Sequence, residues 1–141
     1  MIIFVGLQAA GKSTYYHANL AATHVHVSKD LMKNARNRDE RQRRMIEEAF
    51  RAGKSVAIDN TNPTPYERAP LIELARRHGA RVVAYHFETT VKDAVTRNRA
   101  REGKARVPDL AIFVAAKKLV RPEMAEGFDE VRVIPPLPVS A

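Results

Sequence analysis

The sequence has no cysteine, and no apolar stretch reaches the roughly 20 residues that a membrane-spanning helix needs. Without cysteine there can be no disulfide and no thiolate metal site, which is typical of proteins from a reducing compartment. The chain also opens on an apolar strand pattern, with no basic leader or small-residue cleavage site after it. We therefore expect a cytoplasmic protein with no membrane partner.

With 141 residues, the chain has room for one hydrophobic core and is too short for two ordinary domains. We expect a single domain over residues 1–141 that ends in a proline-rich tail over 135–141. The formal net charge is +8. This excess favours either a polyanionic substrate or simply a well-solvated basic surface, and the charge alone does not choose between them.

Strand-like apolar stretches alternate with helical periodicities along the chain, which predicts an α/β fold with a parallel sheet covered by helices on both faces. The expected strands cover residues 2–5, 25–27, 55–58, 82–87 and 130–134. The expected helices cover residues 12–21, 37–52, 65–79, a segment from 90 into an arginine-rich stretch, and 108–120.

The segment from Gly6 to Ser13 matches the phosphate-binding loop pattern G-x-x-x-x-G-K-[ST], and it joins an expected strand to an expected helix. Gly6 and Gly11 let consecutive backbone N–H groups approach phosphate oxygens. We expect Lys12 to reach the β- and γ-phosphates, Ser13 to ligate Mg²⁺, and Thr14 to assist at the phosphates. The strand–turn–helix context argues against a chance glycine turn. The pattern therefore predicts a P-loop phosphotransferase that uses ATP, or another nucleoside triphosphate, with Mg²⁺.

Two aspartates follow expected strands at the edge of the sheet where ligands of doubly wound folds bind. Asp30 follows the second strand and is the candidate base for an acceptor hydroxyl, although Asp30 could instead be the N-cap of a segment starting at Leu31. Asp59 ends the third strand, like the acidic residue that supports Mg²⁺ in many P-loop enzymes.

Three neutral polar residues, Asn60, Thr61 and Asn62, come directly after Asp59. They can supply hydrogen bonds to an acceptor, or they can form a polar turn before the helix cap at Thr64. We expect them on the substrate side of the site.

A stretch of ten residues carries five cations and one anion, which favours a lid over about 97–107 or, alternatively, a solvated basic helix end. Two of these cations, Arg97 and Arg101, share one helical face, as a pair of donor-clamping arginines requires. A second basic cluster after Asp30 can track a nucleic-acid backbone or merely solvate a helix. That cluster is Lys33, Arg36, Arg38, Arg41, Arg43 and Arg44.

The five histidines show no pair at metal-ligand spacing on a suitable scaffold. His24 and His26 merely flank Val25 on one face of a short strand. We assign no zinc site.

With these residues in place, the chain resembles the kinase domain of the 5′-hydroxyl polynucleotide kinases of phage, bacterial and animal end-healing enzymes. The resemblance implies a P-loop kinase fold with strand order 2-3-1-4-5. It also implies that Asp30 matches the family's general base, and that Arg97 and Arg101 match its paired lid arginines. The resemblance rests on residues 6–14, on Val-Ser-Lys-Asp at 27–30, on Val-Ala-Ile-Asp-Asn-Thr-Asn-Pro at 56–63, on 97–108 and on Ala-Glu-Gly-Phe at 125–128.

The chain departs from that family in two ways. Phage members carry an arginine three residues after the base, and Lys33 stands there in this chain, keeping the charge without the bidentate geometry. Full-length family members also join the kinase to a 3′-phosphatase or a ligase, for which this sequence has no room. We therefore expect a stand-alone kinase or a fragment, with an end-healing phosphatase or ligase as candidate partners.

The sequence thus predicts an ATP-dependent kinase that phosphorylates the 5′-hydroxyl ends of DNA or RNA. One alternative is a related P-loop kinase that acts on a small molecule or on an aminoacyl-tRNA. Another is a non-catalytic module that binds nucleic-acid ends in a nucleotide-dependent way.

Overall fold

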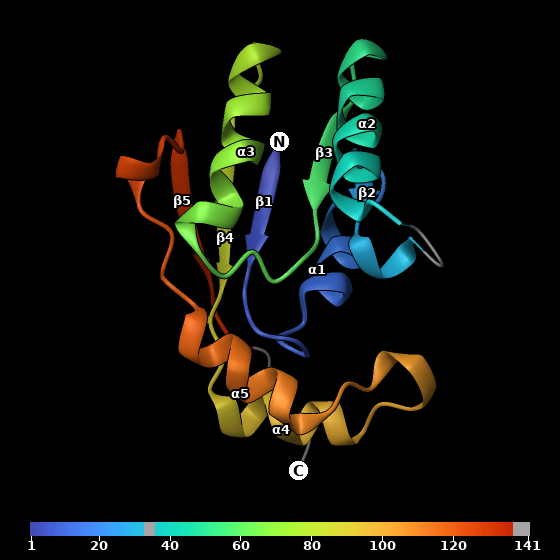
Figure 1. Cartoon of the computed structure of the whole chain (residues 1–141), viewed down its shortest axis with the longest axis vertical. Coiled ribbons are helices and arrows are strands. Elements are labelled where there is room, and N and C mark those ends of the chain that lie inside the picture. The colour runs from blue at the N-terminus through green and yellow to red at the C-terminus, as the bar shows by residue number, and fades with distance from the viewer. Residues whose placement is uncertain (33–35, 137–141) are drawn as a thin grey trace.

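The structure is a computed structural model that describes residues 1–32 and 36–136 of the chain. Lys33, expected to contact the acceptor, and the end of the proline-rich tail lie outside the described residues. The five strands form one parallel sheet in the order β2-β3-β1-β4-β5, which confirms the expected α/β class and strand order (Figure 1). The strands are β1 Ile2–Val5, β2 His24–Val27, β3 Ser55–Ile58, β4 Val83–Phe87 and β5 Glu130–Ile134.

Each expected helix is present, and in the described part of the chain three short 3₁₀ turns lie in the connections. The first helix ends two residues earlier than predicted, because the chain turns over residues 20–23 to enter the second strand. The helices are α1 Lys12–Asn19, α2 Arg38–Arg51, α3 Pro65–Arg77, α4 Val91–Arg99 and α5 Asp109–Lys118. The turns are η1 Lys29–Leu31, η2 Gly103–Ala105 and η3 Met124–Glu126.

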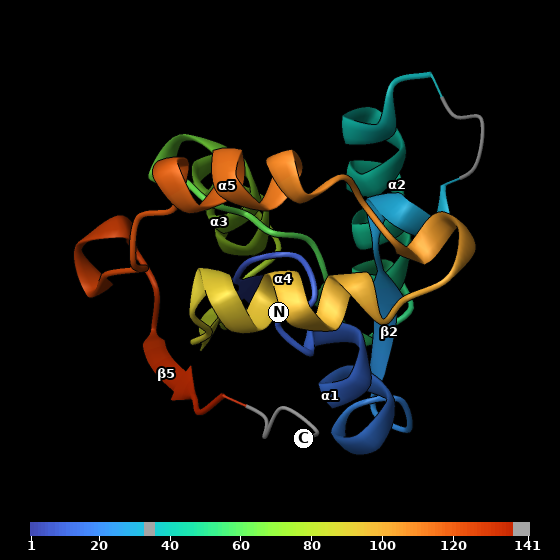
Figure 2. The same ribbon diagram turned by 90° about the horizontal axis from the view of Figure 1, so that it is seen from below.

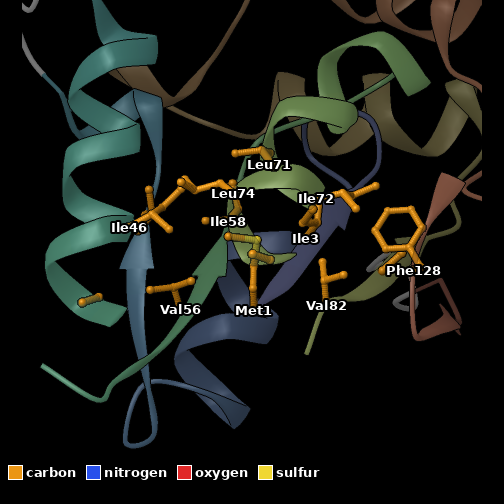
Figure 3. Packing of buried hydrophobic residues seen from close by; sticks show 14 of the residues in the cluster. Met1, Ile3, Ile46, Val56, Ile58, Leu71, Ile72, Leu74, Val82 and Phe128 are labelled. Carbon is orange, nitrogen blue, oxygen red and sulfur yellow. The ribbon is translucent and has the colours of Figure 1, made fainter. Parts of the chain in front are cut away.

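Helices cover both faces of the sheet, because successive residues of each strand point to opposite sides. On one face, Ile3 and Val5 of β1 pack with Ile46 of α2 and Leu71 of α3 (Figure 3). On the other face, the even-numbered residues of β1 pack against α1. The strands are therefore apolar on both sides, and polar side chains gather at the strand ends.

Helices α4 and α5 lie beyond the carboxyl ends of the strands, side by side, and their connection extends toward η1 (Figures 1 and 2). A separate apolar cluster joins them to the first loop through Leu7, with Ala94, Val95, Ile112 and Ala115. Within residues 1–32 and 36–136, no helix is both long and apolar enough to cross a bilayer.

Candidate active site

The phosphate-binding loop follows β1 and is shaped by its two glycines. A Cβ on Gly6 would lie 3.0 Å from the Cβ and 3.1 Å from the carbonyl oxygen of Phe87, so the loop packs closely on the end of β4. Gly11, with φ 91°, stands at the N-cap of α1 in the left-handed region that glycine tolerates. The first N–H groups of α1 lack intrahelical acceptors and point out of the helix end, beside the exposed Ser13 and Thr14. This is a ready cradle for an anion.

Lys12 folds back over this loop and is almost fully buried. Its ammonium donates to the carbonyl oxygens of Gly6 at 2.9 Å and Leu7 at 2.7 Å. Burial lowers the pKa of Lys12 to about 8, while the nearby carboxylates of Asp59 and Asp30 partly counteract this shift. Phosphate oxygens of a nucleotide can replace the two carbonyl acceptors and add the charge that keeps this lysine protonated.

Asp59 and Ser13 form an oxygen-rich corner beside Lys12. The Asp59 side chain is 4% exposed, and its Oδ2 accepts a hydrogen bond from the Ser13 hydroxyl at 2.7 Å. The same Oδ2 lies 2.7 Å from His26 Nε2, and since a carboxylate only accepts, this ring nitrogen donates. Burial by itself would raise the pKa of Asp59, but the hydrogen bonds from His26 and Ser13, with the charge of Lys12, lower it. A hydroxyl and a charged carboxylate are the ligand types that Mg²⁺ takes beside nucleotide phosphates.

Asp30 lies in η1 with its side chain exposed to solvent. Ser28 holds the N-cap position of that turn, so Asp30 does not cap η1 itself. Capping of a segment from Leu31 onward involves residues 33–35, which lie outside the described residues. Within residues 1–32 and 36–136, the Asp30 carboxylate makes no hydrogen bond or ion pair, whereas its neighbour Lys29 pairs with Asp39. Since its charge is felt by Lys12, the carboxylate lies uncommitted on the Lys12 side of the site.

Asn60 and Thr61 tie the substrate side to the phosphate loop. The Asn60 side-chain oxygen accepts from the backbone N–H of Lys29 at 2.9 Å, and its amide donates to Gln42 of α2 at 2.8 Å. The Thr61 carbonyl oxygen accepts from the Gly6 N–H at 3.1 Å. These bonds fix η1, and Asp30 with it, relative to the loop; substrate contacts by Asn60 and Thr61 stay predictions.

Asn62 is held from the interior. It has φ 42° and donates its amide to the Phe4 carbonyl oxygen at 2.8 Å. Its own carbonyl accepts from Arg68 at 2.8 Å, and the guanidinium of Arg68, at 0% exposure, pairs with both oxygens of Glu126 at 2.8 and 3.0 Å. The Ala-Glu-Gly-Phe segment therefore supports the site indirectly, because Glu126 neutralises the arginine that anchors the turn. A substrate contact by Asn62 also stays a prediction.

A groove of about 1040 Å³ runs between α2 and α3 and reaches the polar segment over residues 60–62. Asn60 and Thr61 line its end near the site, and Tyr66, at 87% exposure, lines its α3 wall. Four carboxylates line it as well, each engaged with a basic side chain or a hydroxyl: Asp39, Glu40, Glu67 and Glu73. The groove thus combines these carboxylates with the cations of Lys29 and Arg43 and with apolar side chains such as Leu71 and Leu74.

The arginines of the stretch from residue 97 to 106 make different contacts. Arg101 lies close enough to the phosphate loop for its charge to lower the pKa of Lys12 further, after the main effect of burial. Arg97 is partly exposed on α4, whereas Arg101 lies past the end of this helix at Arg99, so the expectation that the two share one helical face was wrong. Arg99, in contrast, forms an ion pair with Asp109 at 2.9 Å. The structure therefore brings Arg101 to Lys12, whereas Arg99 is engaged with Asp109.

Asn98 joins the two ends of the arginine-rich stretch, and no sequence pattern predicted this role. Asn98 is fully buried, and its side chain exchanges two hydrogen bonds with the backbone of Val107, at 2.6 and 2.9 Å. Both ends of residues 99–106 are thereby pinned together. His26 was also missed as a site residue, because only its contact across the sheet to Asp59 reveals it.

Comparison with known proteins agrees with this geometry. The model of a family described as AAA domain, a P-loop domain, matches residues 1–122. A bifunctional polynucleotide phosphatase/kinase of Schizosaccharomyces pombe is 26% identical over 139 residues, covering 96% of this chain and 33% of the relative. A protein of Acanthamoeba polyphaga mimivirus that provisionally carries the same name is 30% identical over 142 residues, covering 95% and 32%. The resemblance to polynucleotide kinases is confirmed, although this chain spans about a third of those relatives.

Among solved structures, a sugar kinase from Janibacter sp. HTCC2649 superposes with a TM-score of 0.69 at 17% identity, covering 95% of this chain and 83% of that one. This likeness confirms the P-loop kinase fold and leaves the acceptor open, because proteins with this fold act on unrelated acceptors.

Proposed function

Since this chain belongs to the AAA domain family, and its sheet end joins a phosphate loop to an uncommitted carboxylate, we propose that it is an ATP-dependent polynucleotide 5′-hydroxyl kinase. It transfers the γ-phosphate of ATP, or of another nucleoside triphosphate, to the 5′-hydroxyl end of DNA or RNA. The observation that carries the proposal is the exposed Asp30 carboxylate on the Lys12 side of the site, which makes no hydrogen bond or ion pair within the described residues. A kinase needs such a group to accept the hydroxyl proton.

In the proposed reaction, Gly6, Gly11 and Thr14 contribute to the phosphate cradle and Lys12 binds the β- and γ-phosphates. Mg²⁺, held through Ser13 and Asp59, would supply charge neutralisation at the phosphates. The 5′-oxygen attacks phosphorus in line, its proton passes to Asp30, and the bond to the leaving nucleoside diphosphate breaks. Arg101, with Arg97, stabilises the charge on the transferring group.

The groove between α2 and α3 supports a polynucleotide acceptor on the side opposite the phosphate loop. It reaches Asn60 and Thr61, and it carries the exposed aromatic ring of Tyr66, on which a base can stack. Exposed cations lie near η1 as well: Arg36 just before α2, and Arg38 and Arg41 at its start. This distribution of charge favours a terminal nucleoside bound in the groove with its phosphates directed toward the cations. A phosphate backbone running along the groove would instead lie against its carboxylates.

The test is label transfer from γ-labelled ATP with Mg²⁺ to matched DNA and RNA oligonucleotides carrying either a 5′-hydroxyl or a 5′-phosphate. We expect label only on the 5′-hydroxyl ends. The Asp30→Asn variant should lose about 10²–10⁴-fold in kcat, as removal of a general base does. Asp93→Asn is the matched control, because Asp93 stands in the first turn of α4 and should leave transfer unchanged.

The alternatives predict different outcomes of the same assay. Transfer to sugars or to aminoacyl-tRNA, with none to oligonucleotides, would assign the chain to the other acceptors of this fold. Binding of 5′-hydroxyl ends without transfer to any acceptor, unchanged in Asp30→Asn, would identify a binding module. A phosphatase or ligase that co-purifies with the chain would support end-healing partners.

A further inference from the structure

We propose that His26 is a positioning residue for Asp59, holding this carboxylate in the orientation in which it supports the nucleotide-bound Mg²⁺. The proposal rests on the nucleotide-dependent reaction proposed above, and it gives a role to a side chain that the reaction scheme does not use. His26 touches neither phosphates nor acceptor in that scheme; it acts through Asp59.

The first support is the geometry between neighbouring strands. His26 pairs with Ala57 across the sheet, and the backbone N–H of Asp59 donates to Val27 at 2.7 Å. Asp59 is therefore fixed at the main chain by the strand that carries His26. The ring, at 15% side-chain exposure, then fixes the carboxylate through the 2.7 Å hydrogen bond to Oδ2.

The second support is the packing that fixes the ring itself. Tyr16 stacks on His26 with the ring centroids 4.0 Å apart and the planes 15° from parallel. The Tyr16 hydroxyl donates to the carbonyl oxygen of His24 at 2.6 Å, so the tyrosine is anchored at both ends. Since Tyr16 lies on α1 with Ser13, the stack connects the helix that carries one magnesium ligand to the strand beside the other.

The third support is that Ser13 and His26 share one acceptor atom. Both donate to Oδ2 of Asp59, which leaves the other carboxylate oxygen for a cation or its water. When the Ser13 oxygen binds a cation, its hydroxyl can still donate a hydrogen bond to Asp59 Oδ2, but only while the carboxylate keeps its position. Partners behind a metal ligand commonly change metal affinity by about 10–100-fold when they are removed.

The experiment measures cation binding directly, using Mn²⁺ as the probe. Free Mn²⁺ is followed by electron paramagnetic resonance while the protein is titrated with a non-hydrolysable ATP analogue present. We expect His26→Leu to weaken Mn²⁺ binding about 10–100-fold. His26→Gln places an amide N–H near the position of Nε2 and should restore most of that affinity. His26→Asn is too short to reach and should behave like His26→Leu.

His24→Leu is the matched control. His24 lies two residues earlier on the same strand, and its side chain contacts the Thr23 hydroxyl at 2.7 Å instead of the site. This variant should bind Mn²⁺ as the unmodified chain does. Nucleotide affinity without a divalent cation should stay the same in all four variants, and thermal unfolding shows which of them fold.

The proposal is overturned by unweakened Mn²⁺ binding in a folded His26→Leu or His26→Asn variant. It is equally overturned by a folded His26→Gln that binds as poorly as His26→Leu, because ring packing would then be the cause. No acceptor is present and no transfer is measured, so the result does not depend on the acceptor. Failure of 5′-hydroxyl phosphorylation would thus be a separate finding.

Discussion

The two sides of the site are built in different ways. Most of the donor side comes from one continuous segment, residues 6–14, in which Lys12 bonds to carbonyls only five and six residues away. Asp59 and Arg101 join this segment from later parts of the chain. The acceptor side is assembled from segments that are distant in the sequence. Its hydrogen bonds join Lys29 to Asn60 over 31 residues and Arg68 to Asn62 and Glu126, the latter over 58 residues. The donor side is therefore locally specified, whereas the acceptor side depends on the whole fold.

This contrast predicts that substitutions on the donor side damage chemistry and spare stability, while substitutions behind the acceptor side do the reverse. The largest effect should come from Glu126→Gln, which leaves the fully buried guanidinium of Arg68 without its counter-charge. We expect the free energy of unfolding to fall by about 3–5 kcal/mol in urea denaturation. The control is Glu73→Gln, which breaks an arginine–glutamate ion pair whose two partners are exposed. This substitution should barely change the urea concentration at the midpoint of unfolding. Equal effects of the two substitutions would contradict the contrast.

On the donor side, Lys12→Met should lower kcat by about 10²–10³-fold, because a positive group at the transferring phosphoryl is lost. The free energy of unfolding should stay the same or rise, since a buried ammonium is replaced by an apolar side chain of similar length. Kinetics and urea denaturation of one preparation test both parts. A large loss of stability would show that Lys12 also holds the fold.

A smaller effect should separate the two sides kinetically. Asn60→Ala removes the acceptor for the Lys29 N–H and the donor to Gln42, which loosens η1 and Asp30. We expect kcat/KM for the acceptor to fall about tenfold, equivalent to roughly one lost hydrogen bond, while KM for ATP changes little. Asn19→Ala, which removes an exposed bond within α1, is the control. An equal rise in KM for ATP would mean that the two sides are not separable.

The last expected effect is a pH dependence confined to the donor side. Burial lowers the pKa of Lys12 to about 8, so the nucleotide-free protein loses this proton as the pH rises through that value. Because triphosphate binding needs the ammonium, ATP affinity should be flat below about pH 8 and fall by up to about tenfold per unit above it. Equilibrium titrations between pH 7 and 9.5 measure this. In Lys12→Arg, which stays protonated, the decline should vanish.

The part of the site that could be predicted is the part with local signals. Gly6, Lys12 and Ser13 follow a fixed spacing, and Asp59 ends an apolar strand, so their meeting follows from the parallel sheet. Asp30 follows the second strand and lies on the Lys12 side of the site, and its role as the base stays a prediction.

What the sequence could not predict depends on contacts between segments. Asn98 reads as one polar residue in a basic helix, and only the fold buries it against Val107. Arg99 could not be told from its neighbours until Asp109 was placed beside it. His26 looks like a strand-surface residue unless the neighbouring strand is known.

The sequence by itself thus determined the order of strands and helices along the chain, the phosphate loop and the residues that carry charge. Hydrophobic periodicity and glycine spacing act over a few neighbouring residues, so they can be recognised without the fold. Tertiary structure alone decided which charges meet. It buried Arg68 against Glu126, paired Arg99 with Asp109 and set His26 behind Asp59. Side-chain pairing across the sheet and between helices depends on packing and register, which short-range patterns do not encode.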